Sequence, residues 1–517
     1  MRTSALIFLA VISCCVAARG EPGDACGRLM GTTLPHTTLT TAESVPAGKF
    51  APPSGPPLDK IPAFCRVAGV IKPSSDSYIR FEVWMPASGW NQKFLGVGNG
   101  GFAGSIGYGG MGGNLRRGYA TASTDTGHEG DAEDASWAFH HPEKVTDFGY
   151  RGLHETMANA KVLIAAFYGK APGHSYFDSC SDGGREALME AQRFPEDFDG
   201  ILAGAPANYW THMLAGGIGV MQGAYGKNPA GYISSMKLPA IGAAVRAACD
   251  AQDGVKDGII NNPAKCQFDP TVLLCKGEES RSCLTAPQIA ALKVLYTAGG
   301  FAPGGEDVPN GWSSWVIGHG PGGNSGASYL QNYFRYMVFE DPAWNPLTAS
   351  VETAERAAAE KTGHALDATD PDLHKFEERG GKLILYHGWS DPAISPLNTI
   401  RYYQSVTAKM GESKAGSFTR LYMIPGMQHC IGGPGPNWFG QLGTVTAKGA
   451  EHGIYAALEN WVETGAAPGD VIATKYVADS SAKGVAMTRP LCAYPQVAKY
   501  KGTGDVNDAA NFACAAF

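Results

Sequence analysis

The stretch Phe177–Gly184 reads F-D-S-C-S-D-G-G and places Ser181 between two segments of different character. The segment before it, His174–Phe177, is short and largely apolar, as expected for a strand that enters a core. The segment after it, Arg185–Phe194, consists mainly of good helix formers and stops at Pro195. Ser181 is therefore expected on a tight turn between a buried strand and the start of a helix.

A serine on such a turn exposes its hydroxyl beside the free N–H groups of the helix, which is the geometry of a nucleophile elbow. The usual pattern is G-x-S-x-G, and the match here is partial because Ser179 stands in the place of the first glycine. A loop rich in serine and glycine that has no chemical role is the alternative interpretation.

Length and composition allow a large folded core. The chain has 517 residues, of which 44% are hydrophobic and 17% are charged. This length is consistent with about three domains or with one α/β core that carries a large insertion. A net charge of −7 and a pI near 6.0 give no reason to expect nucleic acid or an anionic membrane as a partner.

Residues 1–18 have the pattern of a secretory signal peptide. A basic start is followed by the apolar run Ala5–Val16 and two small residues, so cleavage is expected after Ala18. The run is too short to span a bilayer. The alternative is a lipoprotein signal that would leave Cys14 as a lipidated N-terminus. The sequence thus predicts a secreted or periplasmic protein.

Cysteine usage also fits an exported protein. Of the twelve cysteines, two fall within the signal peptide, which leaves ten in the mature chain. An even number in an exported protein predicts disulfides. Proximity in the sequence favours the pairs Cys26–Cys65, Cys249–Cys266, Cys275–Cys283 and Cys492–Cys514, and leaves Cys180 and Cys430.

Short apolar strands alternate with helical segments along much of the chain. Leu153, Met157, Ala160, Ile164 and Phe167 recur at three- and four-residue steps, as on the apolar face of a helix. Strand, helix and strand at this spacing indicate βαβ units and a mostly parallel, doubly wound α/β sheet. We expect its strands at Lys93–Val97, Tyr119–Ser123, His174–Phe177, Phe198–Ala203, Lys382–His387 and Thr419–Ile424.

Two further elements are expected outside this alternation. Ser77–Trp84 reads S-Y-I-R-F-E-V-W and alternates well enough to predict an exposed strand. Ala447–Thr464 has the pattern of an amphipathic helix that closes the fold.

The alternation of strands and helices breaks down over residues 208–379. This region holds four cysteines, linkers rich in glycine and proline, and an aromatic cluster. We interpret it as an inserted domain, with the sheet and its helices formed by residues 19–207 and 380–517. The aromatic cluster comprises Trp312, Trp315, Tyr329, Tyr333, Phe334 and Tyr336.

Three polar residues each follow an expected strand closely. They are Ser181, Asp391 and His429, and their order along the chain is that of α/β-hydrolases. Catalytic groups of a doubly wound sheet lie at the carboxyl ends of its strands. A serine hydroxyl becomes nucleophilic when a neighbouring base takes its proton and an acid holds that base in the right tautomer. The pattern predicts Ser181 as the nucleophile, His429 as the base and Asp391 as the acid.

Simpler interpretations of these residues remain. Asp391 precedes Pro392 and would also suit an ordinary turn, and Asp125, which ends an earlier strand, is the second candidate for the acid. Any one of the thirteen histidines, His429 included, is more often a satisfied or surface imidazole than a base. His387 also ends a strand, but it precedes the acid and suits a supporting role better.

The two remaining cysteines are neighbours of two of these residues. Cys180 directly precedes Ser181 and Cys430 directly follows His429. If the serine and the histidine meet, the cysteines come close enough for a disulfide, which needs Cα atoms within about 7 Å. Such a bond would hold the nucleophile and base loops together. The alternative is two free, buried thiols, which export disfavours.

Acyl transfer also needs N–H donors for the substrate carbonyl oxygen, on which negative charge develops. The N–H group of Asp182, which follows the serine, is one candidate. The glycine-rich loop Gly98–Gly101 stands in the place of the oxyanion loop of lipases, and Gly101 is its candidate donor. A glycine loop without a chemical role is the alternative.

A turn in the inserted region carries three carboxylates at close spacing. Like charges so close repel one another unless a cation gathers them, and a set of oxygen ligands favours Ca²⁺. The spacing is not that of an EF-hand. A solvated acidic turn is the alternative. The expected ligands are the side chains of Asp250, Asp253 and Asp257 and the carbonyl groups of Val255 and Ile259.

Longer motifs surround these candidate residues. They are C-S-D-G-G-R-E at Cys180–Glu186, Q-R-F-P-E-D-F-D-G-I at Gln192–Ile201, C-D-A-Q-D-G-V-K-D-G-I at Cys249–Ile259, F-R-Y-M-V-F-E-D-P at Phe334–Pro342, G-W-S-D-P at Gly388–Pro392 and M-Q-H-C at Met427–Cys430. Together they resemble the tannase and feruloyl esterase family of secreted α/β-hydrolases, which also includes a bacterial hydrolase of mono(2-hydroxyethyl) terephthalate. The resemblance covers most of the mature chain.

The resemblance implies an α/β-hydrolase fold with a large inserted lid. It implies a Ser181–His429–Asp391 triad tied by a Cys180–Cys430 disulfide, and a structural calcium held by the five ligands named above. The implied substrates are esters of aromatic acids such as gallate or ferulate, with aromatic side chains of the lid stacking on the acyl ring.

We therefore expect a secreted serine carboxylic-ester hydrolase that works through an acyl-enzyme intermediate. One alternative is an esterase of synthetic or aliphatic polyester fragments, such as terephthalate monoesters. The other is a calcium-stabilised binding protein without activity on the same scaffold, because a fold does not guarantee a function.

Overall fold

The structure is a computed structural model of the chain, and it describes residues 25–516 except residues 319 and 321. The expected signal peptide, residues 1–18, and Cys14 lie outside the described residues. Among the described helices, none combines the length and the apolar character that crossing a membrane requires.

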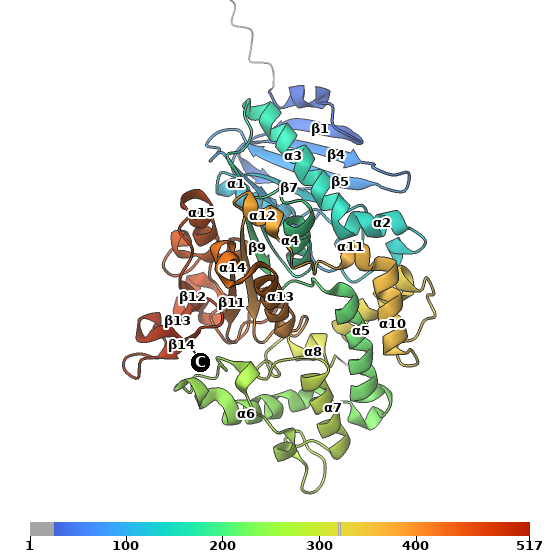
Figure 1. The fold of residues 1–517 in the computed structure, drawn as a ribbon, viewed down its shortest axis with the longest axis vertical. Coiled ribbons are helices and arrows are strands. Elements are labelled where there is room, and N and C mark those ends of the chain that lie inside the picture. Colours follow the sequence, from blue (N-terminus) through green and yellow to red (C-terminus); the bar gives the residue numbers. More distant parts are fainter. Residues whose placement is uncertain (1–24, 319, 321, 517) are drawn as a thin grey trace, which may run out of the picture.

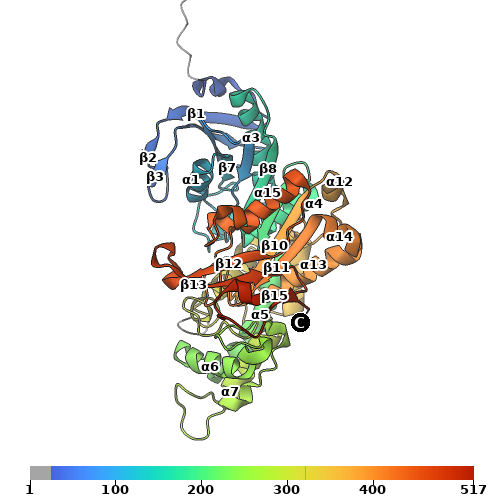
Figure 2. The same ribbon diagram turned by 90° about the vertical axis from the view of Figure 1, so that its left-hand side faces the viewer.

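A nine-stranded sheet forms the framework, in the order β1-β4-β5-β7-β6-β8-β9-β10-β11 (Figures 1 and 2). From β7 to β11 in this order the strands run parallel, whereas β1, β4 and β5 extend the sheet in antiparallel fashion. The predicted α/β-hydrolase sheet is thus confirmed. The strands are β1 (Thr37–Val45), β4 (Phe64–Ile71), β5 (Ile79–Pro86), β6 (Lys93–Gly96), β7 (Ala120–Thr124), β8 (His174–Cys180), β9 (Gly200–Gly204), β10 (Lys382–Gly388) and β11 (Thr419–Ile424).

Helices cover both faces of this sheet. Successive side chains of a strand point to opposite faces. In β10, Leu383 and Leu385 belong to the buried cluster that includes α3, α4, α13 and α14, whereas Ile384 and Tyr386 belong to the cluster that includes α15. The helices outside the insertion are α1 (Tyr108–Arg116), α2 (Pro142–Thr146), α3 (Gly152–Tyr168), α4 (Asp182–Arg193), α13 (Pro396–Met410), α14 (Glu412–Phe418) and α15 (Ile454–Thr464).

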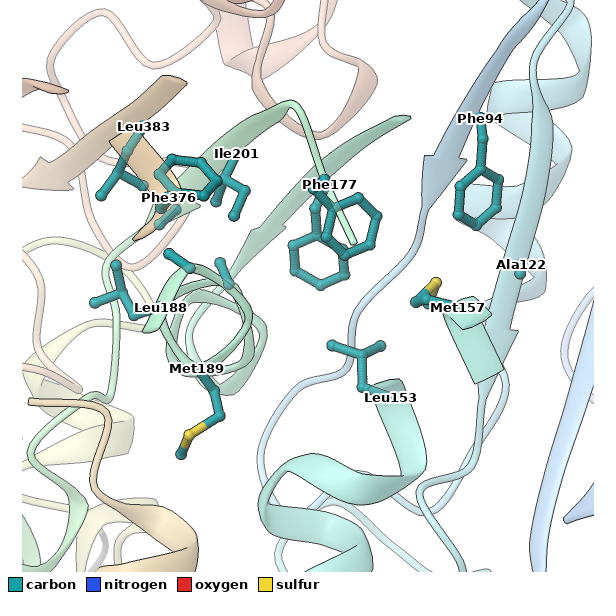
Figure 3. Packing of buried hydrophobic residues seen from close by; sticks show 14 of the residues in the cluster. Phe94, Ala122, Leu153, Met157, Phe177, Leu188, Met189, Ile201, Phe376 and Leu383 are labelled. Atoms are coloured by element: carbon teal, nitrogen blue, oxygen red, sulfur yellow. The ribbon is translucent and has the colours of Figure 1, made fainter. Parts of the chain in front are cut away.

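Figure 3 shows the packing on the first of these faces. Met157 of α3 and Leu188 of α4 lie among Phe94, Phe177 and Ile201 of three neighbouring strands, and all five side chains are almost fully buried. Protein interiors are close-packed, so these side chains hold the ends of the strands in fixed positions. The loops that follow those strands therefore rest on a rigid support.

Between β9 and β10 the chain leaves the sheet and forms the helices α5 to α12, most of which lie below the sheet in Figure 1. Trp210, Trp312 and Tyr333 form part of a second buried cluster there. Phe148, from outside the insertion, packs in this cluster, and Phe376 of α12 packs with the sheet. These helices are α5 (Trp210–Met221), α6 (Leu238–Cys249), α7 (Ala286–Thr297), α8 (Trp312–Trp315), α9 (Ser325–Asn332), α10 (Val351–Ala358), α11 (His364–Leu366) and α12 (His374–Glu378).

Three small two-stranded sheets complete the described fold. They pair β2 (Gly48–Phe50) with β3 (Leu58–Ile61), β12 (Val471–Tyr476) with β13 (Val485–Leu491), and β14 (Val497–Tyr500) with β15 (Phe512–Ala515).

Candidate active site

Ser181 lies on the turn between β8 and α4. Its backbone has φ 69° and ψ −124°, a strained conformation for a residue with a side chain. The Ser181 N–H donates to the Gly204 carbonyl (3.0 Å) and its carbonyl accepts from the Ala207 N–H (3.1 Å). A Cβ on Gly184 would overlap the Gly204 carbonyl, so only glycine allows α4 to start this close to β9. Neighbouring backbone therefore holds the strained turn in place.

His429 and Asp391 meet after the ends of β10 and β11. Nδ1 of His429 lies 2.7 Å from Oδ2 of Asp391. Oδ1 of Asp391 accepts from the N–H groups of Ala393 (2.8 Å) and Ile394 (3.0 Å). Burial alone would raise the pKa of Asp391, but attraction to His429 and hydrogen bonds from His387 and His429 hold it well below its usual value. The buried acid is therefore ionised.

A second histidine, His387, also belongs to the hydrogen-bond network of Asp391. Its Nε2 lies 3.1 Å from Asp391 Oδ2 and 3.2 Å from the Ile394 carbonyl oxygen, and both of these atoms can only accept. The proton is therefore on Nε2, and Nδ1 accepts from the Thr399 hydroxyl at 2.7 Å. His387 is fully buried. His387 therefore lies beside Asp391 in a supporting position, as its place in the sequence favoured.

Asp125, the second candidate for the acid, has other partners. Its Oδ1 accepts from the N–H groups of Arg80 and Gly127, each at 2.9 Å, and its Oδ2 lies 3.2 Å from Nε of Arg80. Burial raises its pKa to about 7. Since His429 is bonded to Asp391, the geometry favours Asp391 as the acid.

A disulfide joins the loops that carry the serine and the histidine. Cys180 and Cys430 are bonded, with their Cα atoms 6.0 Å apart. Ser181 and His429 line one cavity beside this bond. The other pairs expected from proximity are also bonded in the described structure: Cys26–Cys65, Cys249–Cys266, Cys275–Cys283 and Cys492–Cys514.

Gly101 and Asp182, the two expected oxyanion donors, line the same cavity. Within the described part of the chain, neither backbone N–H group donates a hydrogen bond. Gly101 has φ 61°, in the left-handed region that favours glycine. Two unpaired N–H groups beside Ser181 are what a developing oxyanion requires.

The cavity has a volume of about 320 Å³ and is bounded mainly by α5, α9, the loop after α7 and the start of α13. From the predicted aromatic cluster, Trp315 and Tyr329 line it, with ring centres 5.8 Å apart and planes 2° from parallel. The Trp315 ring centre also lies 5.8 Å from that of His429. Trp312 and Tyr333 are instead buried in the insertion core. The cavity therefore presents aromatic faces next to the imidazole.

The acidic turn in the insertion keeps its three aspartates on one loop. Asp253 accepts from the Val255 N–H (3.0 Å), and Asp257 lies 2.5 Å from an Arg489 nitrogen. Burial raises the pKa of Asp253 to about 6, with Asp257 adding to the effect. The three carboxylates do not all lie within 4.8 Å of one another. The set consists of oxygen donors only, which is the ligand chemistry that Ca²⁺ prefers.

Three charged residues near the cavity were not predicted from the sequence. Arg185 is fully buried and bonds to Asp182 Oδ1 at 2.6 Å, a pair that the three-residue spacing on a helix could have revealed. Glu186 contacts the glycine-rich loop, and Arg401 of α13 lines the cavity. Their positions depend on how α4 and α13 pack, for which the sequence has no local signal.

Comparison with known proteins identifies the family of the chain. A sequence model described as tannase and feruloyl esterase matches residues 65–515. The chain is 44% identical to an uncharacterized esterase of Xanthomonas campestris pv. campestris, over 95% of this chain and 91% of that protein. It is 34% identical to mono(2-hydroxyethyl) terephthalate hydrolase of Piscinibacter sakaiensis, over 92% of this chain and 89% of that protein.

The fold is similar to a solved one along nearly its full length. The crystal structure of feruloyl esterase B from Aspergillus oryzae matches with a TM-score of 0.86 at 30% identity, over 95% of this chain and 99% of that chain. The match in sequence and the match in fold therefore agree. The chain belongs to the tannase and feruloyl esterase family and is a carboxylic ester hydrolase.

Proposed function

We propose that the protein is a secreted serine esterase that hydrolyses esters of aromatic acids through an acyl-enzyme intermediate. The observation that carries the proposal is the position of Ser181, on its strained turn, in one cavity with His429, whose Nδ1 is bonded to Asp391. The five disulfides of the described chain support export, because such bonds persist in oxidising compartments.

The proposed reaction gives each residue of the site a role. Ser181 Oγ attacks the ester carbonyl carbon while His429 Nε2 takes its proton, and Asp391 stabilises the imidazolium that forms. The N–H groups of Gly101 and Asp182 receive the oxyanion. The C–O bond then breaks and the alcohol leaves with the proton from His429. Water, activated by the same imidazole, attacks the acyl-enzyme and releases the acid and Ser181.

The aromatic preference rests on the cavity walls. Trp315 and Tyr329 offer ring faces beside His429, and an aromatic acyl group gains from offset or edge contacts with such rings. Two similar proteins, named feruloyl esterase B and mono(2-hydroxyethyl) terephthalate hydrolase, carry names that refer to esters of aromatic acids.

Removing the serine tests the mechanism. Ser181→Ala is expected to lower kcat on methyl ferulate and methyl gallate by roughly a thousandfold or more, because no nucleophile remains. Wild-type protein should react with a fluorophosphonate probe at Ser181. Turnover retained by Ser181→Ala would rule out the serine mechanism, and a wild-type protein that stays unlabelled and inactive would favour the binding-protein alternative. Asp391→Asn should also lose activity. Asp125→Asn, which alters the second candidate for the acid, should retain it.

Arg401 favours a second substrate class, aromatic monoesters that carry a free carboxylate. It lies on the same face of α13 as Leu397, and both line the cavity. Its side chain is exposed and makes no hydrogen bond or ion pair with another described residue. His212, also in the lining, is already paired with Glu355 at 2.6 Å. A free guanidinium at the cavity binds a carboxylate well through two parallel hydrogen bonds.

The test compares monomethyl terephthalate with methyl benzoate. In Arg401→Gln, kcat/KM for the anionic ester should fall by about tenfold or more relative to the neutral one, because a charge-assisted hydrogen bond is lost. Lys375→Gln, which removes an exposed cation of α12 outside the cavity, serves as the control. An unchanged ratio in Arg401→Gln would contradict this preference and leave the serine mechanism intact.

We also propose a structural Ca²⁺ on the acidic turn. The donors are all oxygens, namely the carboxylates of Asp250, Asp253 and Asp257 and the carbonyl groups of Val255 and Ile259. The raised pKa of Asp253, caused first by burial, supports the proposal because a bound cation would offset the cost of burying that charge.

A further inference from the structure

Glu186 is a buried carboxyl group on α4 that takes no part in the proposed reaction. Its side chain is 1% exposed. Its Oε2 accepts a hydrogen bond from the Asn99 N–H at 2.9 Å, and its Oε1 has no hydrogen-bond partner among the described atoms. A buried carboxyl group that is only half satisfied is costly to keep, so its one contact calls for a functional explanation.

That contact lies in the glycine-rich loop. Asn99 is bonded to α4 twice, because its carbonyl also accepts from the Gly183 N–H at 2.9 Å. Its side-chain amide donates to the carbonyls of Ser105 and Thr124, each at 3.0 Å. The approach is close, since a Cβ on Gly98 would lie 2.6 Å from Glu186 Oε2. The loop therefore rests directly on the Glu186 carboxyl group.

The two expected oxyanion donors come from the two parts that Glu186 joins. Asp182 opens α4, one turn before Glu186, and Gly101 follows Asn99 by two residues in the loop. Both N–H groups must lie within about 3 Å of the oxyanion position to stabilise it. The distance between loop and helix therefore sets whether both donors reach the same oxygen.

We propose that Glu186 is a positioning residue for the oxyanion hole. It fixes the loop of Gly101 against the helix of Asp182 through its bond to Asn99. This inference rests on the proposed serine mechanism, and it assigns Glu186 no contact with the substrate.

The bond does not depend on the charge of Glu186. Burial raises the pKa of Glu186 to about 8, the Asp182 carboxyl adds to this shift, and Arg185 opposes it. A carboxylate oxygen and the carbonyl oxygen of a neutral carboxyl group both accept from an N–H donor. The side-chain oxygen of glutamine does so as well, so Glu186→Gln should retain the contact.

Three variants separate positioning from stability. Glu186→Met removes the acceptor and keeps the chain length, and its kcat should fall by about tenfold to a hundredfold with little change in KM, since loss of one oxyanion donor costs about a hundredfold or more. Glu186→Gln should keep kcat near wild type. Glu190→Met is the matched control, because Glu190 is also 1% exposed on α4 but lies beside His154 and Asp197, away from the loop. Whatever its effect on the Tm, it should leave kcat of the folded protein near the wild-type value.

A transition-state analogue adds a readout that a purely structural role would not move. A trifluoromethyl ketone with an aromatic group forms a tetrahedral adduct on Ser181, and Glu186→Met should weaken its binding by the same factor as kcat. If Glu186→Met does not fold, Glu186→Asp replaces it, because the shorter acid withdraws its oxygen from Asn99 and keeps a carboxyl group at this position.

Wild-type kcat in folded Glu186→Met or Glu186→Asp would overturn the inference, as would an equal loss of kcat in Glu190→Met. The proposed function fails separately, through activity retained by Ser181→Ala. The two failures are therefore distinguishable.

Discussion

Asp391, the proposed acid of the triad, accepts four hydrogen bonds, which leaves it no freedom to rotate. Oδ1 of Asp391 accepts from two backbone N–H groups, and Oδ2 accepts from the imidazoles of His387 and His429. A carboxylate with two oxygens has about four acceptor sites, so this buried group is fully satisfied. The orientation of His429, and with it the aim of its Nε2, follows from this fixed acceptor.

His387 is expected to act on catalysis through Asp391. In His387→Leu the acid loses one donor, its orientation is less restricted, and kcat should fall by about tenfold, the value of one charge-assisted hydrogen bond. The kcat of His387→Leu, Asp391→Asn and the double variant measures the coupling. In the Asp391→Asn background, the second substitution should have little further effect. If the fold losses of kcat in the two single variants multiply in the double variant, His387 acts independently of Asp391.

At the scale of elements, buried strands were predictable because they are short apolar runs. The sequence predicts a strand at Lys382–His387, and β10 spans Lys382–Gly388. Ser77–Trp84 was expected to be exposed, yet β5 is almost wholly buried, because β4 and β7 flank it and buried clusters lie on both of its faces. Which neighbours a strand acquires is tertiary information that alternation does not contain.

The expected closing helix shows a second limit. It was predicted from Ala447, but α15 begins at Ile454, after Gly449 with φ 102° and Gly453. Apolar spacing alone does not reveal where glycine interrupts the helical backbone. The candidate triad was predictable for the opposite reason, since each member follows its strand closely and strand ends converge on one edge. The contact of Glu186 and the position of Arg401 depend on how helices pack, which no local sequence pattern indicates.

Calcium on the acidic turn is expected to stabilise the insertion. EDTA should lower the Tm, because without a cation the partly buried carboxylate of Asp253 has no ion pair with a described residue, whereas Asp257 is paired with Arg489, and burial raises the pKa of Asp253 to about 6. In Asp253→Asn the Tm should no longer respond to EDTA. Asp269→Asn, which alters an exposed aspartate elsewhere in the insertion, should keep the response. Less than one calcium per untreated chain, together with a Tm that EDTA leaves unchanged, would count against the site.

At the scale of the whole molecule, the cavity is built from two parts that share their cores. Phe148, from before the insertion, packs with the insertion, and Phe376, near the end of the insertion, packs with the sheet, so each part contributes a side chain to the buried cluster of the other. The Cys180–Cys430 bond adds a covalent tie between the serine and histidine loops. The positions of the cavity walls and the reacting groups relative to one another therefore depend on the packing of both clusters.

Buried carboxyl groups make the stability of this assembly depend on pH. Burial raises the pKa of Asp125 and of Asp178 to about 7 and that of Glu186 to about 8. In the unfolded chain these groups titrate near about pH 4, so between about 4 and 8 the folded state binds more protons. Their contribution is fully present below the lower value and is lost as the pH rises through the upper one. Asp391, whose pKa is lowered, changes nothing in this window.

The Tm should consequently be lower at pH 8.5 than at pH 5.5 at constant ionic strength. For each group, a pKa that differs by one between the folded and unfolded chain corresponds to about 1.4 kcal/mol, so the combined loss is large enough to detect by calorimetry. Asp178→Asn removes one of the titrating groups while preserving an acceptor for the Leu442 N–H, which Asp178 binds at 2.8 Å, and should reduce the difference between the two pH values. Asp372→Asn, an exposed group with a lowered pKa, should not. A Tm that is equal or higher at pH 8.5 would mean that these carboxyl groups reach water in the folded protein and titrate normally.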